Sequence, residues 1–169
     1  MELTYNITEE DYIQFNLFHI RNSQTAVRTL NIQRYLSPVI FIIFSFIFPK
    51  LFDGSLWLSL AIFGIMSILW IVYYPKYYYS HILRHVKKML KEGKNHGILG
   101  EHHMYFADEG IIDKTVTGET KVSWSGIEEF KEDDHNLYLY NSSVSAYILP
   151  KRELENLEGV KQEIKTRLR

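Results

Sequence analysis

The sequence contains no cysteine, so disulfide bonds, thiol catalysis and thiolate metal sites are excluded. A basic face is also lacking, because residues 98–169 carry nine Lys and Arg against fourteen Asp and Glu, whereas residues 1–97 carry ten against six. A protein that binds nucleic acid needs positive charge to neutralise phosphates, so this balance argues against a nucleic-acid partner. No secretory leader is expected either, since the first apolar run begins only near Tyr35.

The signatures of common catalytic and metal sites are absent as well. There is no G-x-S-x-G elbow, P-loop, dinucleotide glycine fingerprint or H-E-x-x-H pair. His81 and His85 lie four residues apart on an expected helix, but no third ligand lies near them in the sequence. The acidic run from Glu128 to Asp134 lacks the EF-hand spacing, and a solvated hairpin tip explains it. We therefore predict no enzymatic activity, no cofactor and no metal site.

Two long apolar runs predict a transmembrane hairpin. Leu56–Tyr74 has nineteen residues without a charge, and an α-helix needs about twenty to cross a bilayer core of about 30 Å. Tyr35–Phe48 has fourteen and reaches that length only if residues 49–52 are added, so a full span and a re-entrant segment both stay open. A buried hairpin in a soluble protein is disfavoured, because this short chain has too little other apolar surface to enclose it. The expected hairpin covers residues 35–75, with helices at about 36–52 and 56–74.

Basic and aromatic residues at the ends of the hairpin indicate its orientation. Lys and Arg are frequent before and after the hairpin, whereas the connecting loop contains only Lys50. Because such residues accumulate on the cytoplasmic side of membranes, both termini are expected in the cytoplasm. The side chains expected at the membrane interface are Arg34, Trp57, Tyr73, Tyr74, Lys76, Tyr77, Tyr78, Tyr79, Lys87 and Lys88.

Two segments flank the expected hairpin. In residues 1–34, the alternation in Glu2–Ile7 indicates a strand, and whether it joins a C-terminal sheet is left open. Thr8 and Asp11 then resemble a capping box that begins an amphipathic helix from about Glu9 to Arg34. Residues 76–97 predict a basic juxtamembrane helix and linker.

Residues 98–169 predict an antiparallel β domain that ends in a helix. Short runs with a period of two residues are separated by turn residues, which is typical of consecutive antiparallel strands. After Pro150, apolar residues recur every three or four positions, which indicates one amphipathic helix. The predicted fold class is an α+β membrane protein, with a bent sheet and a capping C-terminal helix as in pleckstrin-homology-like domains.

A set of motifs in this domain resembles the YcxB-like family. They are Asp108-Glu-Gly110-Ile111, Trp124 with Ile127, the pair Tyr138 and Tyr140, and Ile148-Leu-Pro150-Lys151, all downstream of two spans. The resemblance implies an uncharacterised bacterial membrane protein with a C-terminal domain of the pleckstrin-homology-like kind, and it brings no catalytic or ligand residues. We interpret Trp124, Ile127, Tyr138, Tyr140 and Pro150 as structural, because aromatic and apolar residues at strand spacing usually belong to a core.

Three functions stay open from the sequence. The first is a module in the bacterial cytoplasmic membrane that binds a protein or peptide through a sheet edge or a groove beside the last helix. The second is an immunity or envelope-stress protein against a membrane-active peptide. The third is a lipid-surface sensor that uses the basic segment after the hairpin. The lipid bilayer is the expected common partner, an inositol phosphate is not expected because the turn at Asp108 is acidic, and homo-oligomerisation is left open.

Overall fold

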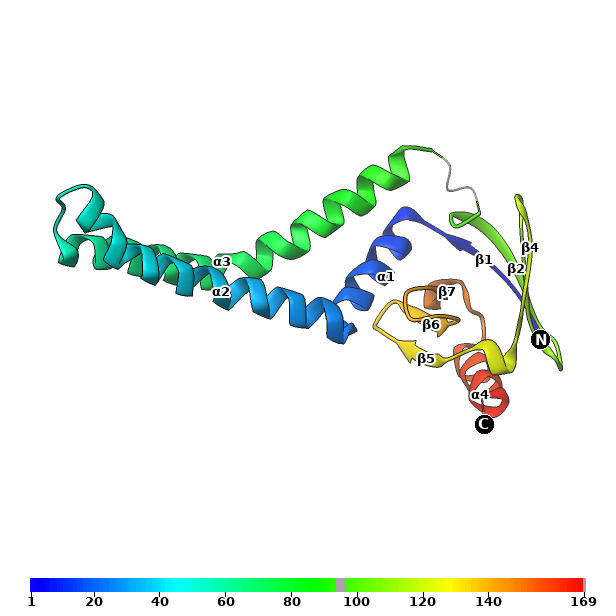
Figure 1. Cartoon of the computed structure of the whole chain (residues 1–169). Coiled ribbons are helices and arrows are strands. Elements are labelled where there is room, and N and C mark those ends of the chain that lie inside the picture. Colours follow the sequence, from blue (N-terminus) through cyan, green and yellow to red (C-terminus); the bar gives the residue numbers. More distant parts are fainter. Residues whose placement is uncertain (94–96, 169) are drawn as a thin grey trace. The chain divides into compact units, whose positions relative to one another are not determined.

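The computed structural model describes residues 1–93 and 97–168 (Figure 1). The chain divides into two units, of which one combines Met1–His19 with Val86–Arg169 and the other is Ile20–His85. Two long apolar helices, antiparallel sheets and a C-terminal helix confirm the predicted α+β class. The finer limits of 1–34, 35–75, 76–97 and 98–169 stay predictions, and residues 94–96 of the expected linker lie outside the described residues.

The first unit contains two antiparallel sheets and a C-terminal helix. The four-stranded sheet has the order β1 (Glu2–Ile7), β2 (Gly100–Phe106), β3 (Gly110–Thr115), β4 (Gly118–Ser123). The three-stranded sheet has the order β5 (Glu129–Glu132), β6 (Asn136–Tyr140), β7 (Ala146–Pro150). Two short 3-10 helices, η1 (Trp124–Gly126) and η2 (Lys151–Glu153), make the corners, and α4 (Leu157–Arg167) ends the unit.

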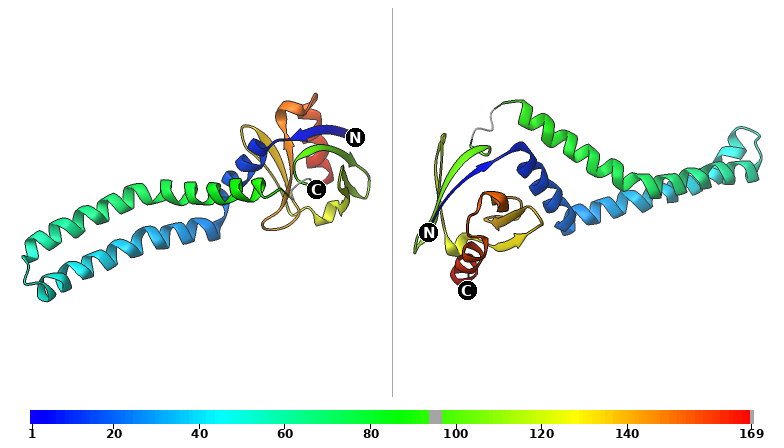
Figure 2. Two further views of the ribbon diagram at one scale, coloured as in Figure 1. Left: turned by 90° about the horizontal axis from the view of Figure 1, so that it is seen from above. Right: turned by 180° about the vertical axis from the view of Figure 1, so that it is seen from behind.

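The N-terminal strand β1 belongs to this unit. It pairs antiparallel with β2 along its whole length, from Glu2 opposite Tyr105 to Ile7 opposite Gly100, and the two strands run side by side in Figure 2. The sequence left open whether residues 2–7 join a C-terminal sheet, and this pairing shows that they do. All of the chain between these paired strands, including both long helices, forms the β1–β2 connection.

The core of the first unit lies between the two sheets and α4. Met104, Ile111, Leu139 and Leu149 are fully buried strand residues, and α4 contributes Val160 and Ile164, which share its apolar face. Burial of one such side chain stabilises the fold by about 1.5–3 kcal/mol. The spacing of three to four residues in the last helix therefore predicted its buried face correctly.

Helix α1 (Glu9–Asn22) begins at the predicted capping box. The Asp11 carboxylate accepts hydrogen bonds from the Thr8 backbone N–H at 2.8 Å and from the Thr8 hydroxyl at 2.6 Å, and the Thr8 hydroxyl accepts one from the Asp11 N–H at 3.4 Å. Phe15 and Phe18 of α1 pack on Tyr138, with ring centroids 5.5 and 4.8 Å apart. Every residue of β6 is consequently buried, because the core covers one face of the strand and α1 covers the other.

One helix expected from Glu9 to Arg34 is in fact two, so this prediction was wrong. Helix α1 ends at Asn22 and α2 (Gln24–Leu51) begins after Ser23. The Ser23 hydroxyl accepts a hydrogen bond from the Ala26 N–H at 3.3 Å, as an N-cap does. A serine that caps the following turn has extended backbone angles and so interrupts the preceding helix.

The second unit is dominated by α2 and α3 (Leu56–Lys91), both long and apolar enough to cross a membrane. In the most apolar window of each helix only 11% of the residues are buried, so the apolar side chains face outward. A soluble core helix would be mostly enclosed, and this exposure indicates membrane association. The Asp-Gly turn is present between the helices, with Asp53 at a φ of 48°.

The long helices continue further than the sequence predicted. Pro38 lies inside α2, and Pro75 lies inside α3. The basic segment after the second span is therefore the C-terminal part of α3 and not a separate helix. Between the two helices, the Arg34 guanidinium donates to the Ile71 carbonyl oxygen at 2.9 Å.

Candidate binding groove beside the C-terminal helix

A groove of about 650 Å³ runs between β5, the preceding corner and the end of α4. Its sheet side includes Trp124, Ile127 and Phe130, and its helix side includes Lys165, Arg167 and Leu168. The volume is in the range of pockets that bind small molecules or peptide side chains. This groove is the candidate functional site.

The floor of the groove is apolar and fixed in position. Trp124 and Ile127 are 9% and 7% exposed. The Trp124 indole N–H donates to the Ala107 carbonyl oxygen at 2.8 Å, and the ring meets Phe106 edge-on at 5.3 Å. The hydrogen bond fixes the indole N–H and the contact with Phe106 fixes the ring, so the floor of the groove is already in place before a ligand binds.

The helix side of the groove carries a guanidinium held by two carboxylates. Arg167 pairs with Asp108 at 2.9 Å and Glu163 at 3.0 Å, and it lies 6.0 Å from the Trp124 ring centroid. Hydrogen bonds to Asp108 and Glu163 raise the pKa of Arg167 above its ordinary value. Lys165, by contrast, forms no ion pair with any of residues 1–93 and 97–168, so it is available to a ligand.

Strand β5, which lines the groove with Glu129 and Phe130, is an edge strand. It pairs with β6, and no other described strand lies on its outer side. An edge strand has backbone N–H and C=O groups without partners and is a template for an added strand. The strand with the free edge therefore also lines the groove.

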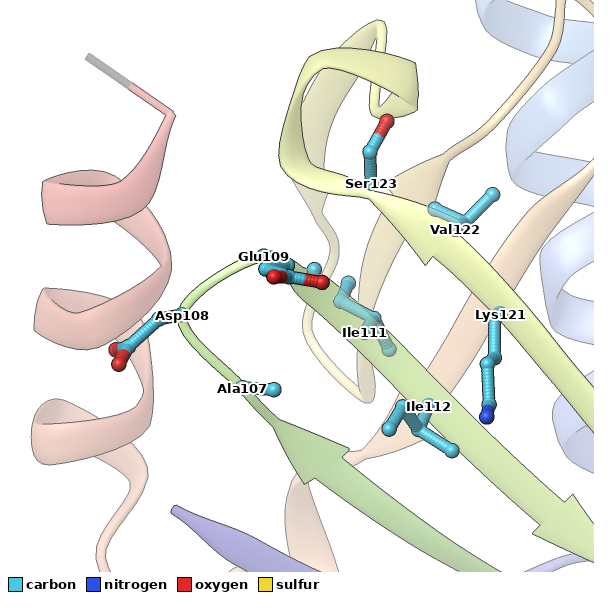
Figure 3. A pocket seen from close by; sticks show the side chains of 9 residues that line it. Ala107, Asp108, Glu109, Ile111, Ile112, Lys121, Val122 and Ser123 are labelled. Carbon is cyan, nitrogen blue, oxygen red and sulfur yellow. The ribbon is translucent and has the colours of Figure 1, made fainter.

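The turn Asp108-Glu109-Gly110 has a structural explanation (Figure 3). A Cβ atom on Gly110 would lie only 2.1 Å from the Val122 carbonyl oxygen, so the close approach of β3 and β4 requires glycine here. Figure 3 shows Asp108 pointing toward α4, where it meets Arg167. A hollow of about 350 Å³ adjoins the turn. This motif joins the first sheet to the last helix.

The residues predicted as structural are all buried. Trp124 and Ile127 form the floor of the groove, and Pro150 ends β7 immediately before η2. Tyr138 and Tyr140 lie under α1. The Tyr138 hydroxyl donates to Asp133 at 2.6 Å, and burial raises the pKa of Tyr140 to about 12.

The residues predicted at the membrane interface lie on the two long helices. Arg34 is on α2, where its guanidinium lies 5.4 Å from the Tyr35 ring centroid, and the others are on α3. Trp57 is 81% exposed at the start of α3, and the Tyr78 hydroxyl donates to the Ala26 carbonyl oxygen at 3.4 Å. The remaining interface predictions in α3 are Tyr73, Tyr74, Lys76, Tyr77, Tyr79, Lys87 and Lys88. A position at the lipid surface stays a prediction for all of them.

Two contacts between polar side chains could not be found from the sequence. Asp11 pairs with Arg152, and His102 pairs with Asp113. Although burial alone raises the pKa of Asp11, hydrogen bonds from Arg152 and Thr8 hold it below its ordinary value. Asp11 and Arg152 are 141 residues apart, whereas His102 and Asp113 lie on adjacent strands, and no periodicity in the sequence brings either pair together. Within the described residues, no three metal-ligating side chains cluster.

Comparison with known proteins gives one match. Residues 106–164, from the end of β2 into α4, match the family model described as YcxB-like protein, which confirms the resemblance predicted from the motifs. No curated protein and no solved structure matches the chain. The matched segment contains every residue of the groove before Lys165, whereas β1, α1 and the two long helices lie outside it.

Proposed function

We propose that this chain, with its YcxB-like domain at residues 106–164, is a membrane-tethered interaction module that captures an extended segment of a protein partner along β5. The observation that carries the proposal is the groove beside α4, which adjoins the free edge of that strand. In β-strand addition, main-chain hydrogen bonds supply affinity and pockets for alternate side chains supply specificity. Two antiparallel sheets followed by one helix support a domain of the pleckstrin-homology-like kind.

The groove favours a partner segment in which apolar and polar residues alternate. Successive side chains of a strand point to opposite sides, so every second residue of the partner would face Ile127 and Phe130. An apolar side chain fits that floor. Lys165 and Glu128 flank the groove without ion pairs inside the described chain, and they would contact polar residues on either side. Capture of an extended segment requires no catalytic side chain, so we propose binding rather than catalysis.

The proposed location is the bacterial cytoplasmic membrane. The two long apolar helices support membrane association, and the excess of Lys and Arg on both flanks supports cytoplasmic termini. A tether confines the domain to the membrane surface, where it would meet other membrane proteins at a raised effective concentration.

Site-specific photo-crosslinking in native membranes tests the proposal. A photoreactive phenylalanine analogue at position 130 lies in the groove, and the same analogue at Tyr105, on the outward face of the first sheet, is the matched control. We expect a discrete cross-linked partner at position 130 and not at 105. Ile127→Ser should weaken the capture, because it removes part of the apolar floor. Equal capture at both positions, or capture at position 130 that Ile127→Ser leaves unchanged, would contradict the proposal.

A further inference from the structure

Helix α3 contains a gap in its backbone hydrogen bonds. In an α-helix each carbonyl oxygen accepts from the N–H four residues later. For Ile71 that residue is Pro75, which has no N–H and whose ring presses on the same carbonyl group. Proline is a common cause of helix bends, and α3 changes direction along its length in Figure 1. Ile71 belongs to the apolar run of residues 56–74, where lipid offers no replacement donor.

The neighbouring helix α2 supplies a donor at this gap. Arg34 donates from Nε to the Ile71 carbonyl oxygen at 2.9 Å. The carbonyl group that Pro75 deprives of its helical partner is therefore the one that the arginine contacts. A charged donor forms a stronger hydrogen bond than a neutral one, so this contact can replace the missing backbone bond. The same guanidinium lies 5.4 Å from the Tyr35 ring centroid, which further restricts its position.

Further contacts with α2 lie on both sides of the proline. Before it, the Trp70 indole N–H donates to the Gln33 carbonyl oxygen at 3.3 Å, and the Tyr74 hydroxyl donates to the Gln33 side-chain oxygen. The Trp70 and Tyr74 rings stack, with centroids 4.7 Å apart and planes within 17°. After it, the Tyr78 hydroxyl donates to the Ala26 carbonyl oxygen at 3.4 Å. Helix α2 therefore holds α3 before and after the gap.

Helix α3 is the element that continues from the second unit into the first. Its residues up to His85 belong to the second unit, and residues 86–91 belong to the first. Pro75 and all of its α2 neighbours lie within the second unit, so these contacts are made inside one compact unit. A bend at Pro75 sets the direction of the segment after the proline relative to the apolar run before it.

We infer that Pro75 is a hinge in α3 and that Arg34 holds this hinge in one position. With Arg34 on the Ile71 carbonyl oxygen, the gap has a donor and the segment after the proline keeps one direction. When Arg34 leaves, the carbonyl group has to find another donor, and the segment samples several directions. The groove beside α4 has no part in this inference, so either proposal can fail without the other.

Distances between two spin labels, measured by pulsed electron paramagnetic resonance on the full chain in lipid bilayers, test the inference. The chain has no cysteine, so Ile65→Cys and Lys87→Cys place labels at two exposed sites, about 33 Å apart in a straight helix. We expect one narrow distance distribution. Arg34→Met removes the donor and should broaden the distribution at least about twofold. The pair Leu58→Cys and Val72→Cys, before the proline, should keep its width.

Two further variants separate the hydrogen bond from the charge. Arg28→Met removes an exposed arginine of the same helix and should leave the distribution unchanged. Pro75→Ala combined with Arg34→Met returns an N–H four residues after Ile71 and should restore a narrow distribution.

Three results would overturn the inference: an unchanged distribution in Arg34→Met, equal broadening by Arg28→Met, or a double variant as broad as Arg34→Met alone. If Arg34→Met is not recovered from membranes, recovery of the double variant with Pro75→Ala is the equivalent rescue. Loss of both Arg34 variants while Arg28→Met is recovered would also overturn the inference.

Discussion

The contact between Arg152 and Asp11 should hold β1 and α1 on the domain, and Asp11→Asn tests this. Arg152 donates to both carboxylate oxygens of Asp11, at 2.5 and 2.8 Å, and to the Asn6 carbonyl oxygen at 3.1 Å. The Asp11 side chain is 3% exposed, whereas that of Arg152 is 47% exposed. The substitution thus removes a buried charge and leaves a cation that water can reach.

The magnitude follows from these contacts. Hydrogen bonds to charged groups contribute about 1.5–3 kcal/mol each. Asparagine retains one acceptor and Arg152 regains hydration, so we expect a loss of about 2 kcal/mol rather than the sum of two bonds. Because each 1.4 kcal/mol is a factor of ten, the backbone amides of β1 should exchange about 30-fold faster with solvent deuterium.

Hydrogen exchange followed by mass spectrometry of the N-terminal peptide measures this effect in the intact protein. Lys121→Gln, which breaks an exposed pair with Glu119, is the control and should change exchange by less than about threefold. Combining Asp11→Asn with Arg152→Gln should cost less than the two single changes together. Exchange of β1 in Asp11→Asn within threefold of the unmodified protein would refute the reasoning.

The pH dependence has a defined sign. The pKa of Asp11 is lower in the folded chain than the unfolded value of about 3.9, so its contribution is complete above that value and is lost as the pH falls through the folded pKa. The difference in unfolding free energy between the unmodified protein and Asp11→Asn should therefore be full at pH 7 and shrink progressively below about pH 4. A difference that stays constant down to pH 2 would exclude the ionised carboxylate as its cause.

Three further predictions concern other parts of the chain. Gly110→Ala should lower stability by about 2–3 kcal/mol or more in thermal unfolding, because its Cβ would lie 2.1 Å from the Val122 oxygen; the control Gly126→Ala, whose nearest contact is 3.4 Å, should change stability far less. Domain stability should fall by about 2 kcal/mol between pH 10 and pH 12, because unfolded tyrosine ionises near pH 10 whereas Tyr140, with a pKa of about 12, ionises later; Tyr140→Phe should remove this share in pH-dependent denaturation. Because β1 and β2 share a sheet, reporters at the two termini should report the same side of the membrane and one at Gly54 the opposite side; opposite readouts at the termini would contradict the pairing.

Local patterns in the sequence correctly predicted several elements of the fold. The capping box at Thr8 and Asp11 was readable because its partners lie three residues apart, and the face of α4 was readable because helical periodicity repeats every three to four residues. The second apolar run met the length of a bilayer crossing, and the turn at Asp53 followed from an Asp-Gly pair. The break at Ser23 was missed, because one serine within a periodic helix pattern is a weak stop signal.

Contacts between distant segments were decided only by the tertiary structure. The sequence suggested a strand at Glu2–Ile7, but both long helices separate it from its partner β2 in the chain, and no local pattern specifies such a distant partner. The groove beside α4 arises where a strand, a corner and a helix from separate segments meet. The sequence by itself therefore determined which residues are apolar, helical or extended. The three-dimensional packing determined that the two long helices lie in the chain between two paired strands of one sheet, and that a candidate groove lies between the other sheet and α4.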